Sequence, residues 1–178
     1  MDVNLNPAAK AVQESVVNLL ELVDKSARDL ASRQIDELHD EAQTVVLMFI
    51  AAIVLADEKY AAGEQAFLRV LVDWSHKPGG EIRYLNEYAE RWKTESLQVP
   101  RFFNAAVQHD FHQRTDLASA MMRELQLIGN NTSASDGKFE IAEQEVVRNY
   151  IRFLDDYRTA WISQSVGIIR PTDGWTSV

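Results

Sequence analysis

Carboxylate side chains recur in two short segments of the chain, which align with each other at a separation of 79 residues. Residues 56–68 read ADEKYAAGEQAFL, and residues 135–147 read SDGKFEIAEQEVV. Carboxylate oxygens are the ligands that calcium and magnesium prefer in proteins. The two segments are therefore the first candidates for a site with chemistry. The aligned pairs are Asp57 with Asp136, Lys59 with Lys138, Tyr60 with Phe139, and Glu64 with Glu143.

Each segment lies between two helical patterns, so that an aspartate follows one helix and a glutamate falls in the first turn of the next. A reversal between helices brings these two positions to the same corner. Asp57 and Glu64 in the first turn, or Asp136, Glu140 and Glu143 in the second, would supply oxygen ligands to a hard divalent cation such as calcium or magnesium.

The same side chains have structural alternatives. Asp136 can accept backbone N–H bonds as a cap, and Glu143 can interact favourably with the positive end of a helix dipole. Lys59 and Lys138 can pair with the neighbouring acids and so lower the negative potential that a cation needs. The sequence leaves the choice between cation site, caps and salt bridges open.

The elements that must position these turns are helical. Apolar residues recur at spacings of three and four, and the chain contains only 7 Gly and 4 Pro, which favours an all-α bundle. The repeat predicts two pseudo-symmetric halves, each a helix, an acidic turn and a helix. Residues 36–55 start with acidic side chains and then become apolar all round, and they are the expected centre. Residues 129–131 are expected to end the sixth helix. The predicted helices cover about 7–34, 36–55, 63–75, 81–93, 100–110, 113–128 and 141–164.

Length and composition set the organisation of the chain. Its 178 residues fit a single helical domain over residues 1–165, followed by a tail or linker over 166–178. Cysteine is absent, which excludes disulfides, thiolate zinc sites and a cysteine nucleophile. The first residues carry no signal-peptide pattern, so a cytoplasmic location is expected. The apolar run over 45–56 is too short to span a membrane, and membrane insertion is not expected.

Charge and missing motifs narrow the function. A net charge of −9 without a basic run argues against nucleic acid as a partner. No nucleotide-binding loop, serine-hydrolase elbow or zinc-protease helix is present, so an enzyme is not expected. His109 and His112 lie three apart, but two ligands do not make a metal site. The aromatic residues of the fourth and fifth helices are expected mainly in the core, with a ligand or partner groove as the alternative: Trp74, Tyr84, Tyr88, Trp92, Phe102 and Phe103.

The second turn, which reads Ala-Ser-Asp-Gly-Lys followed by Glu143, resembles the acidic motif of the TerB-like (tellurite-resistance protein B-like) family. In that family a helix ends in an Ala-Asp-Gly type turn, and the next helix begins with a glutamate about seven residues on. Both copies fit, and with their flanking helices they span about residues 43–161. The resemblance implies an all-α bundle of two pseudo-symmetric halves whose acidic turns bind a divalent metal. The first copy departs from the pattern, with Glu58 where glycine is usual.

Two functions are therefore predicted. The first is a non-enzymatic, stress-related binding module that takes calcium or magnesium at Asp57, Glu64, Asp136, Glu140 and Glu143. The second is a regulatory or adaptor domain of a larger protein, for example one with an ATPase domain, that binds a protein partner across the aromatic fourth and fifth helices. The sequence does not determine an oligomeric state.

Overall fold

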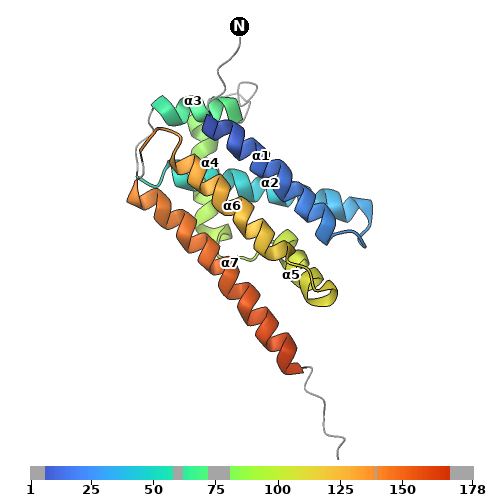
Figure 1. The fold of residues 1–178 in the computed structure, drawn as a ribbon. Helices are drawn as coiled ribbons and strands as arrows, with labels where there is room; N and C mark the ends of the chain where they lie inside the picture. Colours follow the sequence, from blue (N-terminus) through green and yellow to red (C-terminus); the bar gives the residue numbers. More distant parts are fainter. Residues whose placement is uncertain (1–6, 58–61, 72–80, 139, 169–178) are drawn as a thin grey trace, which may run out of the picture.

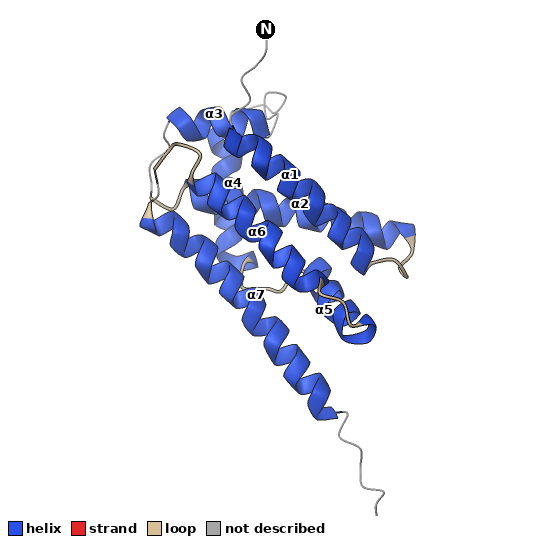
Figure 2. Ribbon diagram, viewed as in Figure 1, coloured by secondary structure: helices blue, strands red, loops and turns tan. Residues whose placement is uncertain are grey.

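The structure is a computed structural model of the chain, and it describes residues 7–57, 62–71, 81–138 and 140–168. Within these ranges it consists of seven α-helices with no strand (Figures 1 and 2), which confirms the predicted all-α class. The helices are α1 (Pro7–Ser26), α2 (Ser32–Val54), α3 (Ala62–Leu71), α4 (Glu81–Glu95), α5 (Arg101–Gln113), α6 (Leu117–Ser133) and α7 (Ile141–Ile168).

Helix α2 forms the centre of the bundle, as its continuous apolar pattern predicts. It packs against α1, α4, α5, α6 and α7, and Phe49, Ile50 and Ile53 on it are fully buried. A helix that is apolar on all faces must be covered on all faces. The Phe49 ring contacts Trp92 of α4 at 5.2 Å and Tyr150 of α7 at 5.3 Å between ring centroids. These aromatic contacts join three helices in one core.

The predicted aromatic core is confirmed for four of the five described residues, and Tyr84 is only partly buried. Phe102 and Phe103 are fully buried, while Tyr88 and Trp92 pack against the core and stay half exposed. Trp74 lies outside the described residues. Most of the aromatic surface of α5 is therefore used for packing.

The sequence repeat is also a repeat of helix boundaries. Helix α2 ends at Val54 and α6 ends at Ser133, which are 79 positions apart. Helix α3 begins at Ala62 and α7 begins at Ile141, again 79 positions apart. The helix boundaries on either side of the two turns thus fall at equivalent residues, as the repeat predicts. The outer ends of the helices do not, because α2 begins at Ser32 and α6 begins at Leu117, which are 85 positions apart.

The hydrogen bonds that end α2 and α6 repeat in the same way. Leu55 N donates to Ala51 O at 3.1 Å, and its counterpart Ala134 N donates to Asn130 O at 3.1 Å. One residue later, Ala56 N donates to Ile53 O at 3.1 Å, and Ser135 N donates to Thr132 O at 3.0 Å. Each helix closes with a tightened last turn of the 3₁₀ type, and each then leads into its acidic turn.

The first helix is shorter than predicted. Helix α1 ends at Ser26 rather than near residue 34, and α2 begins at Ser32. Ser26 Oγ donates to Val23 O at 2.9 Å, a local side-chain bond that competes with continued helix. The side chain of Gln34 then reaches back to accept the backbone N–H of Ala31 at 3.1 Å, which marks the start of a new helix.

The predicted end of the sixth helix is wrong. Residues 129–131 lie inside α6, which continues to Ser133. Gly129 is needed for packing instead: a Cβ there would lie 2.7 Å from Val147 Cγ2 of α7 and 3.1 Å from Phe49 Cζ of α2. The missing side chain lets α6 approach both helices closely, and this approach sets where α7 begins relative to α2.

We expect Gly129→Ala to destabilise the fold. In an open helix the change would add about 1 kcal/mol of stability, but crowding a packed core costs about 1–3 kcal/mol, so the expected net loss is about 1 kcal/mol. Chemical unfolding measures it. A Val147→Ala background removes the closest contact and leaves the one with Phe49 Cζ, so there Gly129→Ala should destabilise less than in the wild type. Stabilisation in the wild-type background would contradict this account of the packing.

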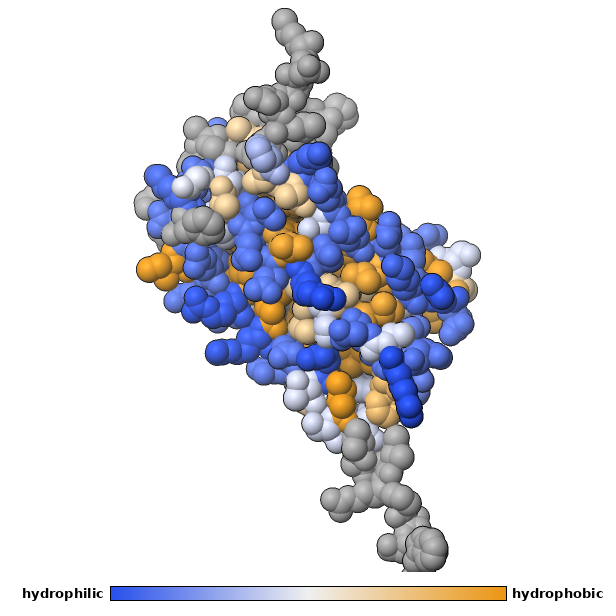
Figure 3. Space-filling view, in the orientation of Figure 1, coloured by the Kyte–Doolittle hydropathy of each residue, from blue (hydrophilic) through white to orange (hydrophobic). Residues whose placement is uncertain are grey.

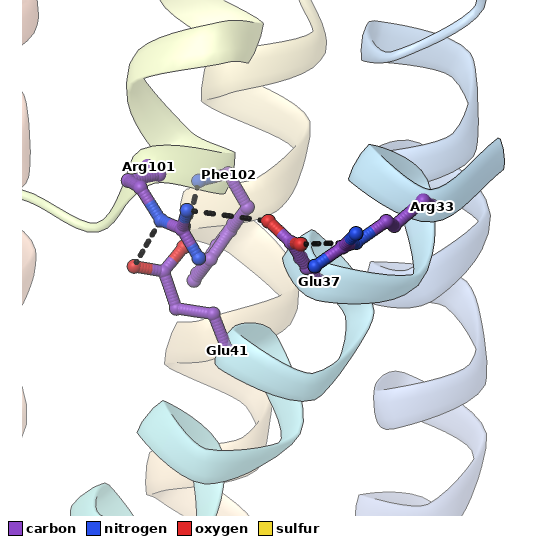
Figure 4. Close-up of polar contacts among 5 residues, drawn as sticks. All are labelled: Arg33, Glu37, Glu41, Arg101 and Phe102. Atoms are coloured by element: carbon purple, nitrogen blue, oxygen red, sulfur yellow. Dashed lines mark hydrogen bonds and ion pairs between the residues drawn. The ribbon is translucent and has the colours of Figure 1, made fainter. Parts of the chain in front are cut away.

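A chain of charges connects α2 to the start of α5 (Figure 4). Glu41 Oε2 accepts the backbone N–H of Phe102 at 3.2 Å, and Glu41 Oε1 pairs with Arg101 Nε at 3.5 Å. Arg101 also pairs with Glu37 at 3.8 Å, and Glu37 pairs with Arg33 at 3.2 Å. Pro100 precedes α5 and makes no side-chain cap. Glu41 therefore provides from α2 the cap that the local sequence lacks.

Helix α7 ends at Ile168, three residues beyond the predicted domain limit of 165. The remaining part of the predicted tail, residues 169–178, lies outside the described residues. Among the helices of the described ranges, none has the length and apolar character needed to cross a membrane.

Candidate metal centre

Glu64 and Glu143 occupy equivalent places in the two repeats. Each is the third residue of its helix, Glu64 in α3 and Glu143 in α7. Each is buried, with 4% of its surface exposed. Glutamates are seldom buried to this extent without a charged or hydrogen-bonding partner. The first turn of a helix stabilises a carboxylate only in part. These two side chains are therefore the natural starting point for a site.

The carboxyl groups of both turns act on Glu143. The pKa of Glu143 is raised to about 7, first by burial and then by repulsion from Glu64, Asp136 and Asp57, in that order. Two of these three neighbours come from the other repeat. Figure 1 shows the corresponding arrangement, with α3, the turn before α7 and the start of α7 at one end of the molecule. The two predicted turn sites are therefore one shared cluster.

The carboxyl of Glu143 is only half satisfied. The backbone N–H of Glu140 hydrogen-bonds to it, which is the capping role that the sequence offers as an alternative. Its other oxygen, Oε2, is buried and has no hydrogen-bond partner among the described residues. A buried hydrogen-bond acceptor that has no partner lowers the stability of the fold by about 1–3 kcal/mol. The cap therefore explains one oxygen of Glu143 and leaves the second without an explanation.

Asp136 shapes the second turn. Its Oδ1 accepts the backbone N–H of Lys138 at 2.8 Å, and Gly137 between them has a φ of 81°, which favours glycine. The side chain of Lys138 is exposed and takes part in none of the ion pairs among the described residues. The predicted competition from this lysine is therefore absent in the described part of the second turn.

Some predicted features cannot be placed. Glu58, Lys59, Tyr60 and Phe139 lie outside the described residues. Glu140 acts on Glu143 through its backbone N–H, and its carboxyl makes no contribution to the raised pKa. Of the other four predicted ligands, three therefore act electrostatically on Glu143, namely Asp57, Glu64 and Asp136, and the Glu140 side chain does not.

The cluster is not a preformed metal cage. In the described ranges, no three Asp, Glu or His side chains are arranged to hold a metal ion. A bound cation would have to draw the carboxylates closer. Side-chain rotation within the two turns is the simplest way to achieve this, because calcium accepts irregular arrangements of oxygen ligands.

The two neighbouring histidines of α5 have other contacts. His109 Nδ1 lies 2.9 Å from Thr115 Oγ1, which in turn donates to Asp110 Oδ1 at 2.6 Å. Asp110 also accepts the backbone N–H groups of Leu117 and Ala118 and so caps α6. The acid beside the histidines thus has a structural role.

In comparisons with known proteins, no family model, no curated protein and no solved structure matches the chain.

Sequence reasoning treated the two turns as separate sites and missed that they share one cluster. The signal for this was present in the repeat. Glu64 and Glu143 are equivalent residues, and two equivalent corners of a repeated unit can face each other. Their burial, however, depends on how the helices pack, which the sequence pattern alone does not give.

The raised pKa of Glu143 predicts how stability depends on pH. The pKa is about 7 in the folded chain, against an ordinary 4.5. Between these values the folded chain binds more protons than the unfolded chain, so the free energy of unfolding falls as pH rises. This stabilisation is present below about pH 4.5 and lost above about pH 7. We expect a loss of about 1–2 kcal/mol, because solvent near the turns screens part of the repulsion.

Glu143→Gln isolates this effect, because the amide is neutral at every pH and its oxygen can still accept the Glu140 N–H. The variant should be more stable than the wild type near pH 8 and similar to it near pH 5, as measured by urea unfolding in a metal chelator. Glu145→Gln, an exposed position on the same helix, is the matched control and should follow the wild type. Parallel pH profiles for wild type and Glu143→Gln would contradict the raised pKa.

Proposed function

We propose that this chain is a non-enzymatic helical binding module that takes a divalent cation between its two acidic turns. The observation that carries the proposal is the Glu143 carboxyl, buried beside Glu64 with its Oε2 lacking a partner in the described structure. Such a group needs either a proton or a cation to be stable. Near neutral pH, a divalent cation would replace the proton.

Electrostatics favour a cation here over a purely structural role for the acids. Glu64, Asp136 and Asp57 each repel the charge of the Glu143 carboxylate. A pair of caps would require no contact between the two turns, since each helix could be capped by its own residues. Bringing the carboxylates together costs stability, and a bound cation would offset that cost.

The ligand chemistry favours calcium, with magnesium as the alternative. Four carboxylates supply at least four oxygen ligands, and water could complete the six to eight that calcium takes. Magnesium demands near-ideal octahedral geometry, which is harder to assemble from two separate turns. The side chain of Glu140, in the same turn as Asp136, is the remaining predicted ligand.

The resemblance to the TerB-like family supports the same function. The family's acidic turns are proposed to bind divalent metal, and Gly137 with its positive φ fits the Ala-Asp-Gly type turn of the second copy. A stress-related role would follow from that resemblance, and so would a cytoplasmic location.

Thermal melts test the proposal. The wild type is first treated with EDTA and then melted with excess calcium, magnesium, manganese or zinc, near pH 7.5 where Glu143 is mostly ionised. A cation at about a hundred times its dissociation constant adds about 2.7 kcal/mol. That gain should raise the melting temperature by about 5–10 °C in a chain of this length. Asp57→Asn and Asp136→Asn should each reduce the shift, because the site uses both turns.

Glu145→Gln is the matched control and should keep the full shift, since Glu145 is exposed on α7 two residues from Glu143. A shift that vanishes in one aspartate variant and is unchanged in the other would contradict a shared site. An absence of any shift with all four cations would overturn cation binding and leave the acids as caps.

A second candidate function is that of a regulatory or adaptor domain that binds a protein partner. The observation in its favour is an open groove of about 640 Å³ between α2, α4 and α5, with Trp92 in its wall. Arginines in this groove are already paired within the chain, Arg91 with Glu95 at 2.7 Å and Arg101 with Glu41 at 3.5 Å. These two arginines are therefore less available to pair with acidic side chains of a partner protein.

A further inference from the structure

A second and larger groove runs between α6 and α7. Its volume is about 1070 Å³, and its lining extends from residue 116 to residue 134 on α6 and from residue 144 to residue 155 on α7. At 1.5 Å per residue, these stretches are about 27 Å and about 17 Å long. The groove therefore has the length of a helix of about four turns. The two helices run side by side in Figure 1.

Three arginines line this groove: Arg123 on α6, and Arg148 and Arg152 on α7. All three are exposed, and no ion pair among the described residues involves any of them. Arg148 and Arg152 are one turn apart on the same face, where like charges oppose each other. In a chain with a net charge of −9, this is a local concentration of unpaired positive charge.

Apolar side chains lie between the arginines. Leu127 is 47% exposed, and it lines the groove with Ile151, which is half buried. Val147 and Met122, both buried, form part of the same lining. Figure 3 shows apolar side chains among polar ones over α6 and α7 on this face. The groove thus offers apolar contact and cationic walls together.

We propose that the groove between α6 and α7 binds an acidic amphipathic helix of a partner protein. The apolar face of such a helix would cover Leu127 and Ile151, and its carboxylates would pair with the arginines. Arginine binds carboxylates in a bidentate geometry that also fixes orientation. Helix binding in an apolar groove is a common recognition mode, and the length of this groove suits it.

The charge distribution favours this occupant over two others. A long nucleic acid or a second copy of the chain would meet the whole acidic surface, and a net charge of −9 repels both. A short acidic helix centred on Leu127 and Ile151 would meet the three arginines, while the two aspartates of the lining are Asp116, beside the start of α6, and Asp155, which is paired with Arg158. The sequence shows no basic run, because Arg123 and the two α7 arginines come together only when α6 packs on α7.

A synthetic probe tests the proposal in EDTA, so that cation binding has no influence on the outcome. The probe is a fluorescently labelled peptide of about 16 residues, long enough for about four helical turns, with a leucine stripe flanked by glutamates. We expect saturable binding to the wild type that weakens with added salt. R148E combined with R152E should weaken binding by about tenfold or more, and Leu127→Ser by about threefold to tenfold.

K25E combined with R28E is the matched control, since it makes the same change in charge at exposed residues far from the groove along the chain that enter none of the ion pairs of the described residues, and it should alter affinity less than about twofold. A peptide with lysines in place of the glutamates should not bind. Thermal melts check that each variant is folded. The proposal is overturned if the acidic peptide does not bind the wild type, or binds the groove variant equally well.

Two further outcomes would also overturn the proposal. If a single-stranded oligonucleotide binds as tightly as the peptide and is insensitive to Leu127→Ser, the groove is an anion site. If the wild type self-associates in sedimentation experiments and R148E with R152E abolishes this, the occupant is a second copy of the chain.

Discussion

The packing of the two repeats imposes one costly interaction, the repulsion between the buried carboxyl groups of Glu143 and Glu64. Two acids at equivalent positions of a repeat can meet only if the two units pack with like ends together. The close approach of α6 to α7 and α2 at Gly129 makes this possible, because it places the start of α7 near the end of α2. In the second turn Asp136 accepts the backbone N–H of Lys138, a bond made within the turn, whereas the repulsion of Glu143 by Glu64 depends on how the two repeats pack.

The burial of a repelled carboxyl group at Glu143 lowers the stability of the fold, so its presence requires an explanation. Core residues such as Phe49 and Leu125 are buried because apolar burial stabilises the fold. Glu143 gains only the Glu140 N–H, and its Oε2 has no partner among the described residues. Groups with raised pKa values that combine burial with specific charged neighbours are concentrated at functional sites. This reasoning connects the geometry of the turns to a cation, and it leaves the rest of the bundle as the support that holds the turns together.

Much of the fold could be predicted from the sequence. The central role of α2 follows from its continuous apolar pattern, and the starts of α4 and α7 and the equivalence of the two units follow from local signals and from the repeat. The break after Ser26 was missed because a single hydroxyl bond and the Gln34 side chain determine it. Gly129 was predicted to end a helix because glycine often does so. Its packing against Val147 depends on a residue from another helix.

The candidate site shows the same limit. The acids themselves could be identified from the repeat, but their convergence could not, because burial at Glu64 and Glu143 is set by tertiary packing. The grouping of the three groove arginines, which form no ion pair among the described residues, could not be predicted either, since Arg123 is far in sequence from Arg148 and Arg152. The acidic turns and the groove share α6 and α7, so a cation at Asp136 and Glu143 would lie beside one end of the groove.

The central claim is that the two acidic turns form one cluster around Glu143. Its most direct test is the titration of the Glu143 side-chain carboxyl by ¹³C NMR in a metal-free sample of the wild type and of Glu64→Gln. The account predicts a pKa of about 7 in the wild type and a lower value in the variant, because one repelling carboxylate is gone. An ordinary glutamate pKa in the wild type, or an identical raised value in both proteins, would contradict it.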